Sequence, residues 1–247
     1  MTTRFSDSHP RLFSIRAIGS FRSVVVLLLM FATSSCGRTL TTAEIQYANT
    51  LYASQMDVDR ITIHSRNPLY AFRSTRDPRP AKTCRERIHP PETAAVETRV
   101  AATTIGNRIF FARRFYLDEF LGQYPKVLPL ADAMLLAHEL THVWQWQNRA
   151  RTGYAPWKAS GEHAQTDDPY LFALHSSARF SDFGYEQQAA LVEEFVCCRA
   201  LAPDAPRTAR LYALLRPEFA GLARRSLVPN SNIVRPNPNF PEGPPCN

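Results

Sequence analysis

Residues 131–148 constrain the fold of this chain more than any other segment. They contain no proline or glycine and place apolar residues at helical spacing, which predicts a long helix. His138, Glu139 and His142 stand in this segment as an HExxH motif. Residues four apart lie on one helix face about one turn apart, so both imidazoles can bind the same metal ion. Glu139 lies at the edge of that face, where its carboxylate can take a proton from a metal-bound water without binding the metal.

The residues around the motif predict that this helix is at least half buried. Residues 133–137 are apolar, and Leu140 and Val143 can pack into a core while the histidines face a cleft. Trp144 and Trp146 are interpreted as core or cleft-wall residues. A pair of satisfied core histidines without a metal is the structural alternative for the motif.

Zinc sites in hydrolases take three protein ligands and keep one position for water, so this site needs a third ligand. The extended HExxHxxGxxH form is excluded, because Gln145 stands at the glycine position and Asn148 at the last histidine. Glu186 opens a second predicted helix, and two further glutamates follow two turns later. The downstream candidates that spacing leaves open are His163, His175, Glu186, Glu193 and Glu194.

Other residues are candidates for supporting the site. Gln145 falls on the metal face of its helix and can orient a neighbouring group. Glu193 or Glu194 can accept a hydrogen bond from a ligating histidine. Negative charge that develops on a substrate carbonyl needs a stabilising donor, and the candidates in the segment that should border the cleft are Tyr170, His175 and Tyr185.

The hydrophobic pattern of the segments outside this helix predicts an α+β fold. A small sheet is expected over the HExxH helix, together with a second, helical half of the domain. Proline-rich residues 73–92 and polar residues 151–183 are expected to be irregular. Strands are expected at 60–64, 100–105 and 107–111, and further helices at 41–53, 185–201 and 206–215.

The N-terminal residues predict export. A short apolar run at 24–32 follows several arginines and precedes small residues, which is typical of a signal peptide and too short for a comfortable transmembrane helix. Residues 34–37 read SSCG, which is similar to a bacterial lipobox, although Thr33 stands where an aliphatic residue is usual. We therefore expect residues 1–35 to be a leader and Cys36 to be a possible lipid anchor. A buried core segment of a cytosolic domain is the alternative.

The rest of the chain is divided into a domain at 36–228 and a proline-rich tail at 229–247. The leader holds four arginines and one aspartate, which account for three of the formal charge of +7 and leave +4, scattered without a basic block. Nucleic-acid binding therefore has no support.

Export gives the cysteines a structural meaning, because disulfides form in oxidising compartments. Cys197 and Cys198 are adjacent and point to different sides of a helix, so each needs its own partner. If Cys36 carries lipid, the partners available are Cys84 and Cys246. A zinc–thiolate site is the alternative, but the chain has no C-x-x-C pair.

Residues 137–145 read AHELTHVWQ, and residues 183–189 read FGYEQQA. This pair resembles a family of small bacterial zincin-like, gluzincin-type metallopeptidases, in which an HE[LM]THVWQ helix is paired with an EQQA helix. The resemblance covers about residues 95–200. It implies a zincin-like fold, Zn²⁺ held by His138, His142 and Glu186, and Glu139 as the general base. It also implies that residues 107–111 form a strand that can pair with an extended peptide substrate.

The resulting prediction is an exported zinc metallopeptidase, periplasmic or anchored to the membrane through lipidated Cys36, that acts on a peptide or protein. One alternative is a catalytically inactive zinc-binding scaffold or interaction domain. Retention of Glu139 speaks against it, because a purely structural site has no use for that carboxylate. The other alternative is a zinc amidase acting on cell-wall peptides, which the sequence does not separate from a peptidase.

Overall fold

The computed structural model describes residues 37–166, 168–175, 178–237 and 246. The predicted leader at 1–35 and the predicted lipid anchor Cys36 lie outside these residues, as do 238–245 and 247 of the predicted tail. By its internal contacts, the chain from Gly37 onward is one unit. Within the described residues, no helix combines the length and the apolar character needed to span a bilayer.

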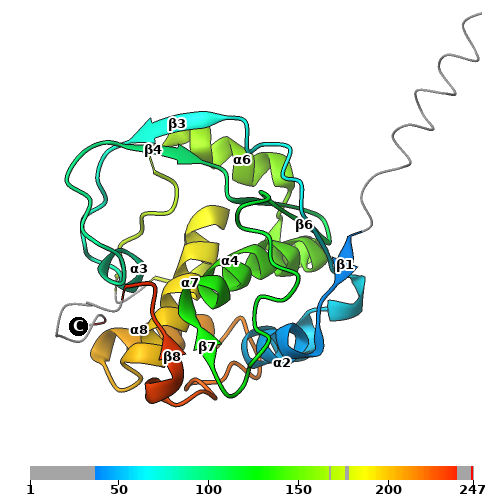
Figure 1. Cartoon of the computed structure of the whole chain (residues 1–247), viewed down its shortest axis with the longest axis vertical. Coiled ribbons are helices and arrows are strands. Elements are labelled where there is room, and N and C mark those ends of the chain that lie inside the picture. The colour runs from blue at the N-terminus through cyan, green and yellow to red at the C-terminus, as the bar shows by residue number, and fades with distance from the viewer. Residues whose placement is uncertain (1–36, 167, 176–177, 238–245, 247) are drawn as a thin grey trace, which may run out of the picture. The chain divides into compact units, whose positions relative to one another are not determined.

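The fold is mixed α+β, as predicted (Figure 1). The helices are α2 (Thr42–Tyr52), α3 (Cys84–Arg87), α4 (Leu130–Gln147), α5 (Arg149–Thr152), α6 (Pro156–Gln165), α7 (Tyr185–Leu201) and α8 (Pro206–Leu215). The strands are β1 (Arg38–Thr39), β2 (Thr62–His64), β3 (Arg73–Arg76), β4 (Val96–Arg99), β5 (Ala102–Ile105), β6 (Arg108–Phe111), β7 (Leu128–Pro129) and β8 (Ile233–Val234).

The main sheet has the strand order β1-β2-β6-β5. β6 pairs in parallel with β2 and antiparallel with β5, and Gly106 supplies the positive φ that the β5–β6 turn requires. The sequence correctly predicts these strands. However, residues 107–111 are not the strand that can receive a peptide, because β6 is hydrogen-bonded on both sides. The edge strands of the sheet are β1 and β5, and β5 is the one that packs against α4.

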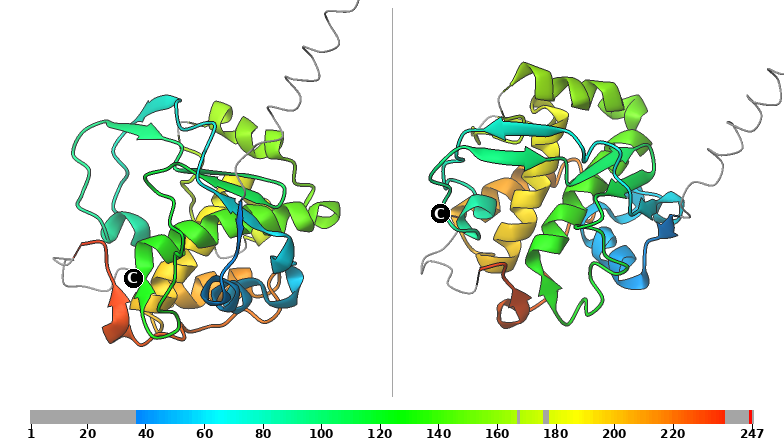
Figure 2. Two further views of the ribbon diagram at one scale, coloured as in Figure 1. Left: turned by 45° about the vertical axis from the view of Figure 1, so that its right-hand side comes forward. Right: turned by 45° about the horizontal axis from the view of Figure 1, so that its top comes forward.

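Helices α4 and α7 form the centre of the molecule (Figures 1 and 2). They pack directly on each other, and α4 also packs against β5. The core between them is dominated by fully buried aliphatic and aromatic side chains, including Leu136, Leu140, Leu191 and Phe195. The two strongest predicted helices therefore bring the HExxH motif and the EQQA motif together.

Several short elements lie in segments predicted to be irregular. The proline-rich loop contains β3, which pairs with β4, and the four-residue helix α3. The polar segment contains α6, which begins with Pro156 at its first turn. Part of the predicted tail forms β8, which pairs with β7. These elements are short or polar, and tertiary contacts stabilise them more than local periodicity does.

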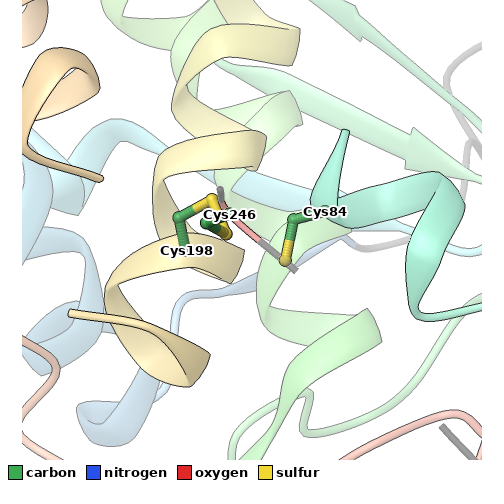
Figure 3. A group of neighbouring side chains, drawn as sticks. All are labelled: Cys84, Cys198 and Cys246. Carbon is green, nitrogen blue, oxygen red and sulfur yellow. A yellow bond between two sulfur atoms is a disulfide. The ribbon is translucent and has the colours of Figure 1, made fainter. Parts of the chain in front are cut away.

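Two disulfides tie the outlying segments to α7. Cys84 is bonded to Cys197 and Cys198 to Cys246, which confirms that the adjacent pair takes one outlying cysteine each. Cys84, Cys198 and Cys246 lie side by side (Figure 3), with sulfur atoms within 4.8 Å of one another. Because all three are disulfide-bonded, they do not offer thiolates to a metal ion. The disulfides indicate an oxidising compartment outside the cytoplasm.

Candidate metal site

Helix α4 brings His138 and His142 to one wall of a cleft. Their ring centroids lie 5.1 Å apart, and both side chains are buried. Helix α2 anchors α4 from below the site, because the hydroxyls of Tyr47 and Tyr52 donate hydrogen bonds to two carbonyl oxygens of α4. A buried tyrosine hydroxyl needs such a partner, so these bonds fix the rotation of α4 and the direction of its histidines.

Glu186, in the first turn of α7, completes a cluster of three donors. Its Oε2 atom lies 3.4 Å from Nε2 of His138 and 3.4 Å from Nε2 of His142. One donor atom from each residue lies within 4.8 Å of the other two, and all three residues are buried. Two imidazoles and one carboxylate are a common ligand set of hydrolytic zinc sites, so this group could hold a metal ion.

Helix α6 fixes the position of Glu186 by capping α7. The carboxylate of Glu162 accepts hydrogen bonds from the backbone N–H groups of Tyr185 and Glu186, at 2.7 and 2.9 Å. These N–H groups have no partner inside the helix, and the positive end of the helix dipole favours a carboxylate there. Gly184 leaves room for this approach, because a Cβ atom would lie 2.9 Å from both carboxylate oxygens.

Each histidine is held through its second ring nitrogen. Nδ1 of His138 lies 3.2 Å from Oε2 of Glu193, and Nδ1 of His142 lies 2.9 Å from Oε1 of Gln145. The amide nitrogen of Gln145 in turn donates to Gln188 Oε1 at 2.9 Å. With Nδ1–H donating in this way, the lone pair of the neutral ring is on Nε2, the nitrogen that faces Glu186 and could bind a metal. Both supporting residues are among those that the sequence singled out.

The remaining candidates for the third ligand are not part of the three-donor cluster. Glu194 accepts hydrogen bonds from the Cys84 N–H and from Arg207, on the side of α7 that faces the disulfide. Nε2 of His163 lies 3.6 Å from the second oxygen of Glu186, at the edge of the cluster. His175 is not among the residues that line the cleft.

Glu139 is buried beside the cluster and is not part of it. Its Oε2 atom accepts a hydrogen bond of 2.7 Å from the hydroxyl of Thr104, on the edge strand β5. This contact holds the carboxylate at the cleft, next to the two histidines. The sequence offers no local signal for Thr104, because only the packing of β5 against α4 brings it to the motif.

The cluster stabilises positive charge. Burial opposes the charge on Glu186, but His142 and His138 outweigh it and hold the pKa of this carboxyl well below its usual range. Burial likewise disfavours the protonated form of His138, but hydrogen bonds to Glu186 and Glu193 outweigh it and raise its pKa to about 10. Without a metal ion, the cation that these carboxylates attract is a proton. A divalent cation would displace it, so the donor set fits a metal.

Two tyrosines border the cluster. The ring of Tyr170 lies 5.6 Å from that of His138, and the ring of Tyr154 lies 6.1 Å from that of His142. Burial and the nearby carboxylates raise the pKa of both hydroxyls, so both stay protonated and can donate hydrogen bonds. The sequence singled out Tyr170 but missed Tyr154. Tyr185 lines a different cavity, and its hydroxyl donates to a backbone carbonyl.

The cluster opens into a cleft of about 600 Å³. β5, the segment before β3 and helix α6 line it together with the motif residues. Trp144 does not reach this cleft; it is a core residue that packs on Phe219. Trp146 borders a separate cavity beyond the β5–β6 turn. The cleft is therefore formed by the motif and by elements that the sequence places far from it.

Comparisons with known proteins add one structural neighbour. No family model and no curated protein matches this chain. Among solved structures, the effector domain of Pseudomonas aeruginosa VgrG2b matches with a TM-score of 0.44 and 18% identity, over 81% of this chain and 94% of that domain. Membership of the zincin-like family therefore stays a prediction made from the two motifs.

Proposed function

We propose that this chain is a zinc-dependent peptidase that hydrolyses peptide bonds outside the cytoplasm. One observation carries the proposal: His138, His142 and Glu186 gather three donor atoms, while Glu139 stands beside them with its carboxylate held separately by Thr104. A zinc site that is purely structural has four protein ligands, whereas a catalytic site has three and a position for water. Among the described residues, this site gathers three.

The residues of the chain have distinct parts in the proposed reaction. Zinc, when bound, would polarise the substrate carbonyl and make a water molecule more acidic. Glu139 takes a proton from this water molecule while the oxygen of the water attacks the carbonyl carbon. The C–N bond then breaks, and Glu139 gives the proton to the departing amine. Tyr154 and Tyr170 are the protonated donors nearest to the cluster and can stabilise negative charge on the carbonyl oxygen.

The edge strand β5 suggests how a substrate is held. β6 pairs with one side of it, and residues of β5 line the cleft that contains Glu139. An extended peptide can add to such an edge through backbone hydrogen bonds. This would bring successive carbonyls of the peptide past the metal site, which is the arrangement a peptidase needs.

The two alternative functions explain fewer of these features than a peptidase does. A metal-binding scaffold or interaction domain gives no role to the buried, hydrogen-bonded Glu139. A zinc amidase acting on cell-wall peptides shares the chemistry and differs in substrate. For either enzyme, the disulfides support action after export, with the predicted leader and Cys36 providing secretion and membrane anchoring.

Removal and return of the metal tests the proposal. The exported form is purified, its metal content is measured, and hydrolysis of a labelled unfolded protein is followed before and after treatment with a chelator. We expect about one zinc per chain, loss of hydrolysis on chelation and recovery on addition of zinc. Hydrolysis that continues in the metal-free protein would contradict the proposal, as would an absence of bound metal.

A further inference from the structure

Half of the exposed large hydrophobic side chains in the described part of the chain lie at the cleft of the proposed metal site. Four of the exposed ones line it: Leu69, Phe72, Ile105 and Trp157. Phe72 and Trp157 are the most exposed large hydrophobic residues in the described part of the chain, at 67% and 75%. Exposed apolar side chains that gather in one place mark a binding surface, whereas scattered ones do not.

These residues come from separate segments that meet only in the fold. Leu69 and Phe72 precede β3, Ile105 ends the edge strand β5, and Trp157 lies in the first turn of α6. Their shared position is therefore not a by-product of one hydrophobic stretch of sequence. They surround the same cleft as the metal cluster, so a substrate at the cluster would contact them.

The cleft offers no lysine or arginine to pair with an acidic substrate side chain. No lysine or arginine is among its lining residues, and its carboxylates are those of Glu139 and Glu186. Two arginines lie over the ring of the cleft residue Tyr170, and both are already paired: Arg79 binds Asp168 at 2.5 Å, and Arg85 binds Glu86 at 2.9 Å. An acidic side chain moved from water into this cleft would lose hydration beside the carboxylates of Glu139 and Glu186, without gaining a lysine or arginine partner.

We propose that the cleft selects peptide segments with a large apolar side chain, aromatic or leucine-like, next to the bond that is cut. This inference rests on the proposed function and names its substrate class. Extended segments of unfolded proteins present such side chains. Cell-wall stem peptides, which are rich in alanine and free carboxylates, present few, so the inference also separates the peptidase from the amidase alternative.

Peptide binding to a zinc-loaded Glu139→Gln variant tests the inference independently of turnover. Two labelled peptides share one uncharged, extended sequence and differ at a central position, which is Phe in one and Glu in the other. Fluorescence anisotropy gives the affinity of each. Since a buried apolar group commonly changes affinity tenfold or more, we expect the Phe peptide to bind at least tenfold more tightly.

Variants of the cleft identify where the peptide binds. Trp157→Ser and Phe72→Ser, made in the Glu139→Gln background, should each weaken binding of the Phe peptide several-fold. Leu227→Ser is the matched control, because Leu227 is 53% exposed but is not among the cleft-lining residues. It should leave the affinity unchanged. Both exposed cleft residues can be replaced without opening a core, and zinc content and melting temperature verify that each variant is folded.

The outcomes separate this inference from the proposed function. Equal or tighter binding of the Glu peptide overturns the inference, as does a loss of affinity in the Leu227 variant equal to that in the cleft variants. The same holds if the wild-type protein cuts unfolded proteins only beside small or charged residues, or cuts a cell-wall peptide in preference. In those last two cases the protein still hydrolyses peptides. The proposed zinc-dependent hydrolysis is then retained, and only the proposed substrate class is wrong. Tight binding of the Phe peptide without hydrolysis by the wild type supports the inference and contradicts the proposed function.

Discussion

His138 and His142 present the same ring nitrogen to Glu186, but different groups hold their second nitrogens. Glu193 is charged and is itself paired with Arg85 at 3.4 Å, whereas Gln145 is a neutral amide within a chain of hydrogen bonds. A charged acceptor makes an imidazole a stronger metal ligand than a neutral one does. In the proposed zinc site, Glu186 would therefore bind the metal directly, and Glu193 would act on it through His138.

Replacement of these two glutamates should separate their roles. Glu186→Ala removes one of three ligands and should weaken zinc binding more than Glu193→Ala, for which a loss of about 10- to 100-fold is expected. Glu193→Ala keeps all three donors of the cluster but removes the contact with Nδ1 of His138. Glu97→Ala is the control, because Glu97 is the exposed residue of β4. Zinc titration with a competing chelator gives the zinc affinity of each variant. A larger loss of zinc affinity for Glu193→Ala than for Glu186→Ala would identify Glu193 as the ligand.

Thr104 should act as a positioning residue for Glu139. Thr104→Val keeps the shape of the side chain but removes the hydrogen bond to the carboxylate, so kcat should fall about tenfold while zinc content and KM stay close to the wild type. Thr104→Ser retains the hydroxyl and should retain most of the rate. Equal rates for the valine variant and the wild type would show that the contact has no catalytic role.

Among the elements, α3 is connected to the metal site in spite of its four residues. Helices this short are not stable alone, and the Cys84–Cys197 disulfide fastens α3 to α7. Arg85 of α3 pairs with Glu193, which in turn contacts His138. The Cys84–Cys197 disulfide is therefore linked through Arg85 and Glu193 to His138, a proposed metal ligand, whereas the second disulfide joins Cys246 to α7.

Loss of the two disulfides should affect zinc binding differently. The double variant Cys84→Ser/Cys197→Ser frees Arg85 from its fixed place and should lower zinc affinity several-fold. The matched control Cys198→Ser/Cys246→Ser also loses a disulfide but leaves α3 attached, so its zinc affinity should stay closer to the wild type. Both are compared at a temperature at which each is folded. Equal zinc affinities for the two double variants would contradict a specific role for α3.

The elements also show which parts of the structure can be predicted from the sequence. α4 and α7 are long and periodic, so local pattern finds them, and with them His138, Glu139, His142 and the candidate Glu186. α6 and β3 are short and polar, and their stability depends on contacts such as that between Glu162 and the start of α7. Thr104 and Tyr154 could not be assigned, because they reach the site only through the packing of distant segments.

The molecule as a whole depends on its disulfides for stability. Their cysteines are separated by 113 and 48 residues, and in the loop-entropy account either bond alone stabilises the folded state by about 4–5 kcal/mol. Mass spectrometry of the unreduced exported protein should find no free thiol at Cys84, Cys197, Cys198 or Cys246. Reduction should lower the free energy of unfolding by several kcal/mol in denaturant titrations. Four free thiols in the exported protein would show that the bonds do not form.

The central claim is that the metal site hydrolyses peptide bonds and that Glu139 handles the proton without binding the metal. The most direct measurement determines zinc content and hydrolysis of an unfolded protein in parallel, for the wild type and for Glu139→Gln. The account predicts one zinc per chain in both proteins and a rate reduced at least 100-fold in the variant. A variant that loses its zinc, or one that keeps both its zinc and its rate, would contradict the account.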